Sequence, residues 1–196
     1  MEIVFASQNE HKVVEMNAIA KAFGSAVEFI LPSAGFDPVE DGETFVENAE
    51  IKAVEAAKME QGGRKLFLAD DSGLCIDALS GEPGLKSARY APTNNERIEK
   101  VLKNLKGVSE RGAHFVCAIA LCDENGKILH TTEGFCYGKI ALVPSGDGGF
   151  GYDPIFIPEG YNCTIAELSD EEKNKISHRG KALREMLEWI ANSRLS

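Results

Sequence analysis

The stretch at residues 66–74, Leu-Phe-Leu-Ala-Asp-Asp-Ser-Gly-Leu, constrains the fold more than any other part of the chain. Its apolar run is too short for a helix and is bounded by polar residues and a glycine. This pattern predicts a buried strand that ends abruptly at Asp70 and Asp71. Neighbouring strand residues point to opposite faces, so the two carboxylates are expected to leave on opposite sides. Acids at the carboxyl end of a buried strand are typical of a site in an open α/β sheet, and equally of a simple turn.

Composition narrows the class of protein. The 196 residues suffice for one sizeable domain, and no repeat, low-complexity segment or flexible linker divides them. A net charge of −10 argues against non-specific nucleic-acid binding but allows a small phosphorylated ligand beside local bases or a divalent metal. No apolar run approaches the roughly 20 residues that span a bilayer. The acidic N-terminus lacks the features of a signal peptide, so a cytoplasmic protein is expected.

The cysteines point the same way. The chain has five, an odd number, with no Cys-x-x-Cys pair, and most lie in apolar runs. Such cysteines are typical of reduced, mostly buried thiols in a cytosolic protein, and they argue against a zinc site.

Apolar periodicity predicts strands that alternate with helices. Strands are expected at residues 2–6, 27–31, 66–71, 75–79, 113–122 and 155–157, with one or two more in 127–143, interrupted at Gly134 and Gly138. Residues 164–168 are expected to be extended. Helices are expected to follow four capping boxes, at Ser7, Thr44, Thr93 and Ser169, and a last helix is expected from residue 177.

A polar turn at residues 7–12 connects the first predicted strand to the first predicted helix. A helix N-terminus offers unpaired N–H groups and a partial positive charge, which suit a phosphate. Asn9 can donate an amide hydrogen, and Lys12 in the first turn can reach the same anion. A plain connection is the commoner meaning of this pattern, because the turn lacks the glycines of a P-loop.

Five blocks, in order along nearly the whole chain, together resemble one family. They are Ser7-x-Asn9-x-x-Lys12-x-x-Glu15; Thr44-Phe45-x-Glu47-Asn48-Ala49-x-x-Lys52-Ala53; Ala69-Asp70-Asp71-Ser72-Gly73-Leu74, continuing to Asp77-Ala78-Leu79 and Ser87-Ala88-Arg89-Tyr90-Ala91; Gly149-Phe150-Gly151-Tyr152-Asp153-Pro154-x-Phe156; and Lys173-x-x-x-Ser177-His178-Arg179-Gly180-Lys181-Ala182. The sequence resembles the non-canonical purine nucleoside triphosphate pyrophosphatases, also called inosine triphosphate pyrophosphatases or dITP/XTP diphosphatases.

The resemblance implies an α/β fold with an elongated mixed central sheet flanked by helices and two lobes around a nucleotide cleft. It implies one such domain over residues 1–196, a homodimer, and Mg2+-dependent hydrolysis of dITP, ITP and XTP to the monophosphate and pyrophosphate. A purine nucleoside triphosphate is then the expected substrate, with no nucleic acid and no membrane as partner.

The resemblance also implies the site residues. Asp71 is the expected catalytic base, and Glu40 and Asp71 are the expected metal ligands, with Asp70 in reserve. Phosphate contacts are expected from Ser7, Gln8, Asn9, Glu10, His11, Lys12, Lys52 and Ser72, and base contacts from Phe150, Gly151, Tyr152, Asp153, Lys173, His178 and Arg179. Asp41-Gly42 stands where the family often has Thr-Gly, so Asp41 and Glu43 leave open which acid binds the metal.

These residue types fit the chemistry. Mg2+ typically takes one or two carboxylates plus phosphate oxygens, and hydrolysis needs a base for the attacking water. Cationic donors favour a purine with a six-position oxygen over adenine, which carries an amino group there. A pyrophosphatase for other modified nucleotides and a nucleotide-binding module without turnover are the alternatives.

Overall fold

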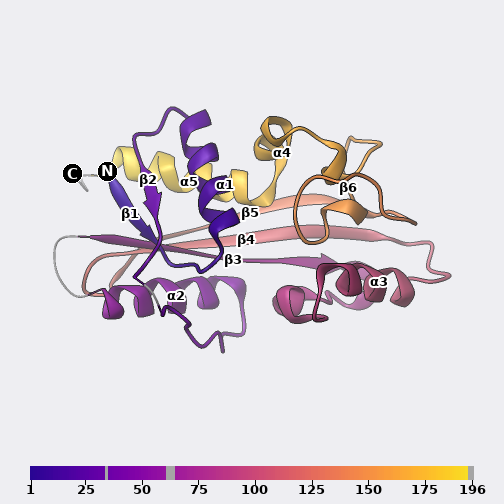
Figure 1. The fold of residues 1–196 in the computed structure, drawn as a ribbon, viewed down its shortest axis with the longest axis horizontal. Coiled ribbons are helices and arrows are strands. Elements are labelled where there is room, and N and C mark those ends of the chain that lie inside the picture. The colour runs from indigo at the N-terminus through magenta and orange to yellow at the C-terminus, as the bar shows by residue number, and fades with distance from the viewer. Residues whose placement is uncertain (34, 61–64, 194–196) are drawn as a thin grey trace. The chain divides into compact units, whose positions relative to one another are not determined.

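The computed structural model describes residues 1–33, 35–60 and 65–193. Within these ranges, six strands form one sheet in the order β2-β1-β3-β4-β5-β6 (Figure 1). The strands are β1 Glu2–Phe5, β2 Glu28–Ile30, β3 Leu66–Ile76, β4 Gly112–Cys122, β5 Ile128–Ile140 and β6 Phe156–Pro158. β1 is parallel to both β2 and β3, whereas β5 and β6 are antiparallel, so the sheet is mixed.

Helices connect and cover the strands. They are α1 Glu10–Ala22, α2 Phe45–Met59, α3 Asn94–Asn104, α4 Asp170–Ile176 and α5 His178–Asn192. Short 3-10 turns lie at Asp77–Leu79, Gly84–Arg89, Asp153–Ile155 and Ile165–Glu167. In the described chain, no helix combines the length and apolar character that crossing a bilayer requires.

The chain forms two compact units. Unit 1 comprises Met1–Asp71, Cys117–Gly134 and Arg179–Ser196, and unit 2 comprises Ser72–Val116 and Phe135–His178. β3, β4 and β5 each contribute residues to both units.

Unit 1 buries an apolar cluster on each face of its strands. Ile3 and Phe5 of β1 join the cluster that α1 and α5 complete, whereas Val4 and Ala6 join the cluster that α2 completes. Figure 1 shows α1 and α5 on one side of these strands and α2 on the other. Since successive strand residues face opposite ways, near-continuous apolar runs are what a sheet covered on both faces requires.

Unit 2 has one apolar cluster. Ile98 and Val101 of α3, with Leu105 just after its end, pack with residues of β3, β4, β5 and β6. The half-buried guanidinium of Arg111 donates to the carbonyl oxygens of Leu105, Ile140 and Ala141 at 2.8–3.0 Å. It thereby satisfies backbone acceptors where α3 and β5 end.

Three strand predictions are wrong. β3 does not end at Asp70 and Asp71 but continues to Ile76, so residues 75–79 divide between the end of β3 and a 3-10 turn. β5 runs without interruption through Gly134 and Gly138. A Cβ atom at Gly138 would collide with the Ile157 carbonyl oxygen of β6, so this glycine marks a close strand approach and not a break.

The capping predictions divide. Thr44 and Thr93 form complete capping boxes with Glu47 and Glu96, as predicted, and Ser169 caps α4. The box at Ser7 is wrong, because Asn9 caps α1 and accepts from the N–H groups of His11 and Lys12. Residues 164–168 are not an extended piece but a 3-10 turn with its own Thr164–Glu167 capping box.

Candidate active site

Asp70 and Asp71 lie where β1, the parallel neighbour of β3, has ended. The register pairs Phe5 with Leu68, and the Ala6 N–H donates to the Leu68 carbonyl oxygen at 2.7 Å before the chain turns away. The aspartates are therefore in the middle of β3, which corrects their predicted place. The two aspartates follow the last residue of β3 that pairs with β1, so they lie beyond the carboxyl end of β1.

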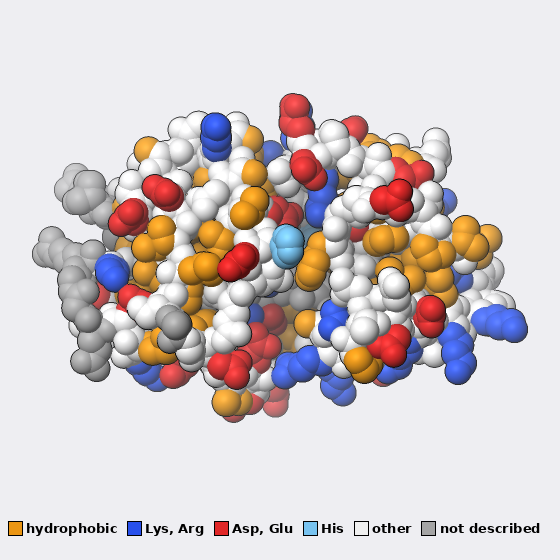
Figure 2. All heavy atoms as spheres, in the orientation of Figure 1, with side chains coloured by type: hydrophobic (Ala, Val, Ile, Leu, Met, Phe, Trp, Pro, Cys, Tyr) orange, Lys and Arg blue, Asp and Glu red, His pale blue; other side chains and the backbone are white. Residues whose placement is uncertain are grey.

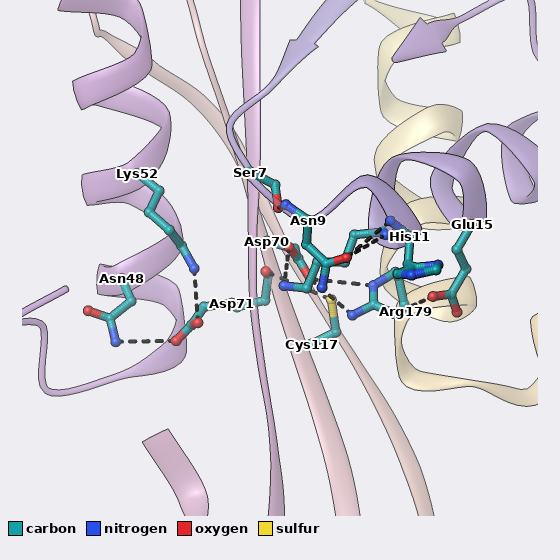
Figure 3. Close-up of polar contacts among 12 residues, drawn as sticks. Ser7, Asn9, His11, Glu15, Asn48, Lys52, Asp70, Asp71, Cys117 and Arg179 are labelled. Carbon is teal, nitrogen blue, oxygen red and sulfur yellow. Dashed lines mark hydrogen bonds and ion pairs between the residues drawn. The ribbon is translucent and has the colours of Figure 1, made fainter. Parts of the chain in front are cut away.

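Strand alternation sends the two carboxylates to opposite faces, as predicted (Figure 3). Leu68 belongs to the cluster of α1 and α5, and Ala69 to the cluster of α2. Asp70 accordingly meets Lys12 of α1 and Arg179 of α5, whereas Asp71 meets side chains of α2.

The Asp70 carboxylate is held by two cations. Its side chain is 1% exposed, with Lys12 Nζ 2.8 Å from Oδ1 and Arg179 Nη2 3.3 Å from Oδ2. Arg179 Nη1 lies 2.6 Å from Glu15 Oε2, so these four side chains form a continuous ion-pair chain. Burial alone would raise the pKa of Asp70, but the charges of Lys12, Arg179 and Lys52 outweigh it and hold that pKa well below its usual range.

The Asp71 carboxylate is held by two donors on one face of α2. Lys52 Nζ lies 3.0 Å from Oδ1, and Asn48 Nδ2 donates to Oδ2 at 3.2 Å. The side chain of Asp71 is 14% exposed. Burial raises its pKa, the positive charge of Lys52 opposes the shift, and Asp70 and Glu40 add to it.

Glu40 is the acid of its loop that joins this group. Its Oε1 lies 2.9 Å from Lys52 Nζ, so one ammonium bridges Glu40 and Asp71. Asp41 and Glu43 are exposed, and the Glu43 N–H donates to the helix residue Glu47. Burial lowers the pKa of Lys52, but the charges of Asp71, Asp70 and Glu40 outweigh it, so the pKa is raised and the ammonium stays charged.

A metal ion would need more than these two acids. Within the described residues, no group of three or more His, Cys, Asp and Glu side chains is placed to hold a metal alone. Mg2+ commonly binds one or two carboxylates and completes its shell with substrate phosphates and water. Glu40 and Asp71 fit that mode.

The turn before α1 is partly occupied by its own contacts. Ser7 Oγ accepts from the Asn9 N–H at 3.1 Å, and the Gln8 amide donates to the Phe36 carbonyl oxygen. Glu10 and His11 are exposed, whereas Lys12 extends back to Asp70. Of the eight predicted phosphate residues, the structure thus brings Lys12 and Lys52 to the two carboxylates. Ser72 follows Asp71 in the chain and is half-buried.

The predicted base-binding residues, Arg179 excepted, belong to unit 2. Asp153 Oδ2 accepts from the Phe150 N–H at 2.6 Å and lies 3.0 Å from Lys173 Nζ. Gly149 has a φ of +77°, and a Cβ atom there would collide with the Asp153 side chain. The backbone at Gly149 therefore passes close to this carboxylate. Phe150 is left 46% exposed, and Gly151 is half-buried.

Tyr152 and His178 make interior contacts of the same unit. The Tyr152 hydroxyl donates to the Ser87 carbonyl oxygen at 2.8 Å, and burial raises its pKa. The His178 ring stacks on Phe115 with centroids 4.8 Å apart. Arg179, by contrast, is 4% exposed among the acids of unit 1, so its guanidinium contacts Asp70 and Glu15.

Sequence reasoning gave no role to Asn48 or Glu15. The available signal for Asn48 was its spacing, because positions four apart share a helix face and Lys52 was already a candidate. Glu15 belongs to the first block, three residues after Lys12, but its partner Arg179 is 164 residues away in the chain. Local pattern does not reveal such a contact.

Comparison with known proteins shows which family this chain resembles. The Ham1 family profile matches residues 3–189. A protein of Desulforamulus reducens named dITP/XTP pyrophosphatase is 46% identical over 196 residues, covering 97% of this chain and 96% of the relative. A protein of the same name from Synechocystis sp. is 43% identical over 188 residues, covering 95% and 94%.

Solved structures agree on the fold. The structure of a HAM1 protein from Coxiella burnetii has a TM-score of 0.87 at 44% identity, covering 98% of this chain and 100% of that one. The Ham1 protein of Staphylococcus aureus gives 0.85 at 38% identity, covering 98% and 99%. The expected mixed α/β fold flanked by helices is confirmed, and so is the resemblance. This chain belongs to the Ham1 family.

Proposed function

We propose that this protein hydrolyses dITP, ITP and XTP to the nucleoside monophosphate and pyrophosphate, and so removes deaminated purines from the nucleotide pool. One observation carries the proposal. Two carboxylates, Glu40 and Asp71, converge on the buried ammonium of Lys52. The full-length relatives that align with this chain are named dITP/XTP pyrophosphatases.

We assign the metal to Glu40 and Asp71, with Mg2+ as the ion. When bound, Mg2+ neutralises phosphate charge and holds phosphate oxygens in place. The two carboxylates converge on Lys52, so their oxygens lie together where a divalent cation could take them as ligands. Asp70 is a poorer ligand because two cations already surround it.

Asp71 is the proposed general base. It takes a proton from water as the water oxygen bonds to the α-phosphorus, and the bond from that phosphorus to the pyrophosphate oxygen breaks. A raised pKa makes Asp71 a better proton acceptor than an ordinary aspartate. Lys12 and Lys52 supply positive charge to the triphosphate, with Asn9, Ser7 and Ser72 as additional contacts.

Recognition of the base is assigned to unit 2. The exposed Phe150 ring offers a stacking surface, and Lys173 is a cationic donor suited to a six-position oxygen. Adenine carries an amino group at that position, so two hydrogen-bond donors would face each other. Because neither would then have an acceptor, such a site discriminates strongly against adenine. Arg179 has the same charge, but its contacts support Asp70, so a direct base contact for it is the weaker assignment.

The proposal extends to the setting of the enzyme. We expect a homodimer in the cytoplasm without a nucleic-acid partner. On the face drawn in Figure 2, Lys and Arg side chains are scattered among acidic and apolar ones and form no continuous basic surface. With a net charge of −10, such a surface suits a small nucleotide better than a polyanion.

A panel of nucleotides tests the proposal. Purified protein with Mg2+ is given dITP, XTP, dATP, dGTP and dUTP, and pyrophosphate is measured separately from orthophosphate. We expect pyrophosphate from dITP and XTP at rates at least ~100-fold above those from dATP, as an unmet polar group predicts. Preference for another modified nucleotide, or tight dITP binding without pyrophosphate release, would replace the proposal with one of the two alternatives.

A further inference from the structure

We propose that Asn48 is a positioning residue that fixes the Asp71 carboxylate and the Glu40 loop to one another. The inference rests on the proposed function and explains how its two acids are held in register. Asn48 is 2% exposed, one turn before Lys52 on the buried face of α2. All the contacts involved belong to unit 1.

Both ends of the Asn48 amide are used. Its Oδ1 accepts from the Gly42 N–H at 2.9 Å, and its Nδ2 donates to Asp71 Oδ2 at 3.2 Å. The Gly42 group can only donate and the carboxylate can only accept, so one orientation of the amide satisfies both. Asparagine is suited to this position because it carries a donor and an acceptor on one short, uncharged side chain.

The loop is pressed against the helix at the same point. A Cβ on Gly42 would lie 2.8 Å from Asn48 Oδ1 and 2.9 Å from Glu47 Cβ, closer than real Cβ contacts come. Glu47 Oε2 accepts from the N–H groups of Glu43 and Thr44 at 2.6 and 3.2 Å. The backbone two to four residues after Glu40 is therefore tied to the first turn of α2.

Asn48 and Lys52 together bind both oxygens of one carboxylate. Asn48 holds Oδ2 while Lys52 holds Oδ1, and Lys52 also contacts Glu40. A carboxylate held at both oxygens does not rotate freely, so Asp71 keeps one orientation toward an incoming ligand. Preset groups of this kind avoid reorganisation when charge arrives. Asn48 acts through Asp71 and the loop and touches no reacting atom.

Three variants test the positioning role of Asn48, and a fourth variant serves as a matched control. Asn48→Ala removes the amide, Gly42→Ala disturbs the same hydrogen bond from the loop side, and the double variant combines them. The control is Asn17→Ala in unit 1. Like Asn48, Asn17 uses both ends of its amide, but it donates to the carbonyl oxygen of Phe29 and accepts from the N–H group of the same residue. Asn17 contacts no carboxylate among these bonds.

Two readouts separate positioning from folding. The first is the half-saturating Mg2+ concentration for pyrophosphate release from dITP, with kcat and KM at saturating Mg2+. The second is Mn2+ affinity by electron paramagnetic resonance, which needs no turnover. Loss of a residue that orients ligands typically weakens metal affinity or activity about 10–100-fold. We expect that loss in Asn48→Ala and Gly42→Ala, a KM for dITP within about twofold of wild type, and a double variant little worse than either single one.

The outcomes are distinct. Asn17→Ala should lower the melting temperature yet keep wild-type metal dependence. Wild-type Mg2+ and Mn2+ dependence in folded Gly42→Ala or Asn48→Ala overturns the proposal, and so do fully additive losses in the double variant. If the wild-type protein releases no pyrophosphate from dITP, the proposed function fails, while the Mn2+ titration still tests the positioning role of Asn48.

Discussion

Two faces of one strand carry neighbouring aspartates in opposite situations. On the α1 and α5 face, the carboxylates of Asp70 and Glu15 are matched by the cations of Lys12 and Arg179. On the α2 face, the carboxylates of Asp71 and Glu40 both contact Lys52. The difference follows from strand alternation, which gives adjacent residues different neighbours.

The contrast indicates how the two acids divide their work. Asp70 is 1% exposed and charge-balanced, which suits a group that orients Lys12 and stabilises the fold. Asp71 is 14% exposed and lies near a second carboxylate, Glu40, which suits a group that meets a cation and water. The pKa directions agree, since Asp70 is held ionised and Asp71 is shifted toward accepting a proton.

The largest expected effect is on turnover. Asp71→Asn removes the proposed base and one metal ligand, so kcat should fall by about 10²–10⁴, the usual contribution of a general base. The melting temperature should fall less than in Asp70→Asn, because Glu40 still faces the Lys52 ammonium. Pyrophosphate release and thermal unfolding are measured on the same preparation. Near wild-type turnover in a folded variant would remove Asp71 from the base role.

Asp70→Asn should act on stability instead. Removing one charge of a buried ion-pair group commonly lowers the free energy of unfolding by about 3–5 kcal/mol, because the buried Arg179 guanidinium then loses a carboxylate partner. Urea unfolding at pH 7 checks this value. The same variant should keep more activity than Asp71→Asn, and equal loss of activity without loss of stability would erase the distinction between the faces.

Acid should reduce that stability difference. The folded pKa of Asp70 lies below its unfolded value of about 3.9, so its contribution is fully present above that pH. The contribution is lost as pH falls toward the folded pKa. In urea unfolding from pH 7 to pH 3, the difference between wild type and Asp70→Asn should therefore stay constant down to about pH 4 and then begin to narrow. A difference that is constant over this range contradicts the assignment.

The smallest effect concerns the helix that holds Asp71. Thr44→Ala removes the cap of α2 and should lower the free energy of unfolding by about 1 kcal/mol. Thr93→Ala, which removes the matching cap of α3 in unit 2, should do the same. Because the α2 cap adjoins Gly42 and Asn48, only Thr44→Ala should also raise the half-saturating Mg2+ concentration. An equal half-saturating Mg2+ concentration in both variants would show that the Thr44 cap of α2 has no influence on the metal site.

Sequence predicted most of what local pattern controls. Thr44 and Thr93 were identified as caps because capping is a three-residue relation, and the opposite faces of Asp70 and Asp71 follow from the strand period. The length of β3 was not predictable, since Asp-Asp-Ser-Gly has turn character and only long-range strand pairing overrides it. The contacts of Arg179 with Glu15 and Asp70 join residues more than 100 positions apart, beyond any local pattern.

Hydrolysis of dITP in H2¹⁸O tests the central claim most directly, namely that this protein directs water to the α-phosphorus. Wild-type protein with Mg2+ is allowed to turn over once, and the products are separated and weighed by mass spectrometry. The account predicts one ¹⁸O atom in the monophosphate and none in the pyrophosphate. Label in the pyrophosphate, or release of orthophosphate and a diphosphate, would contradict it.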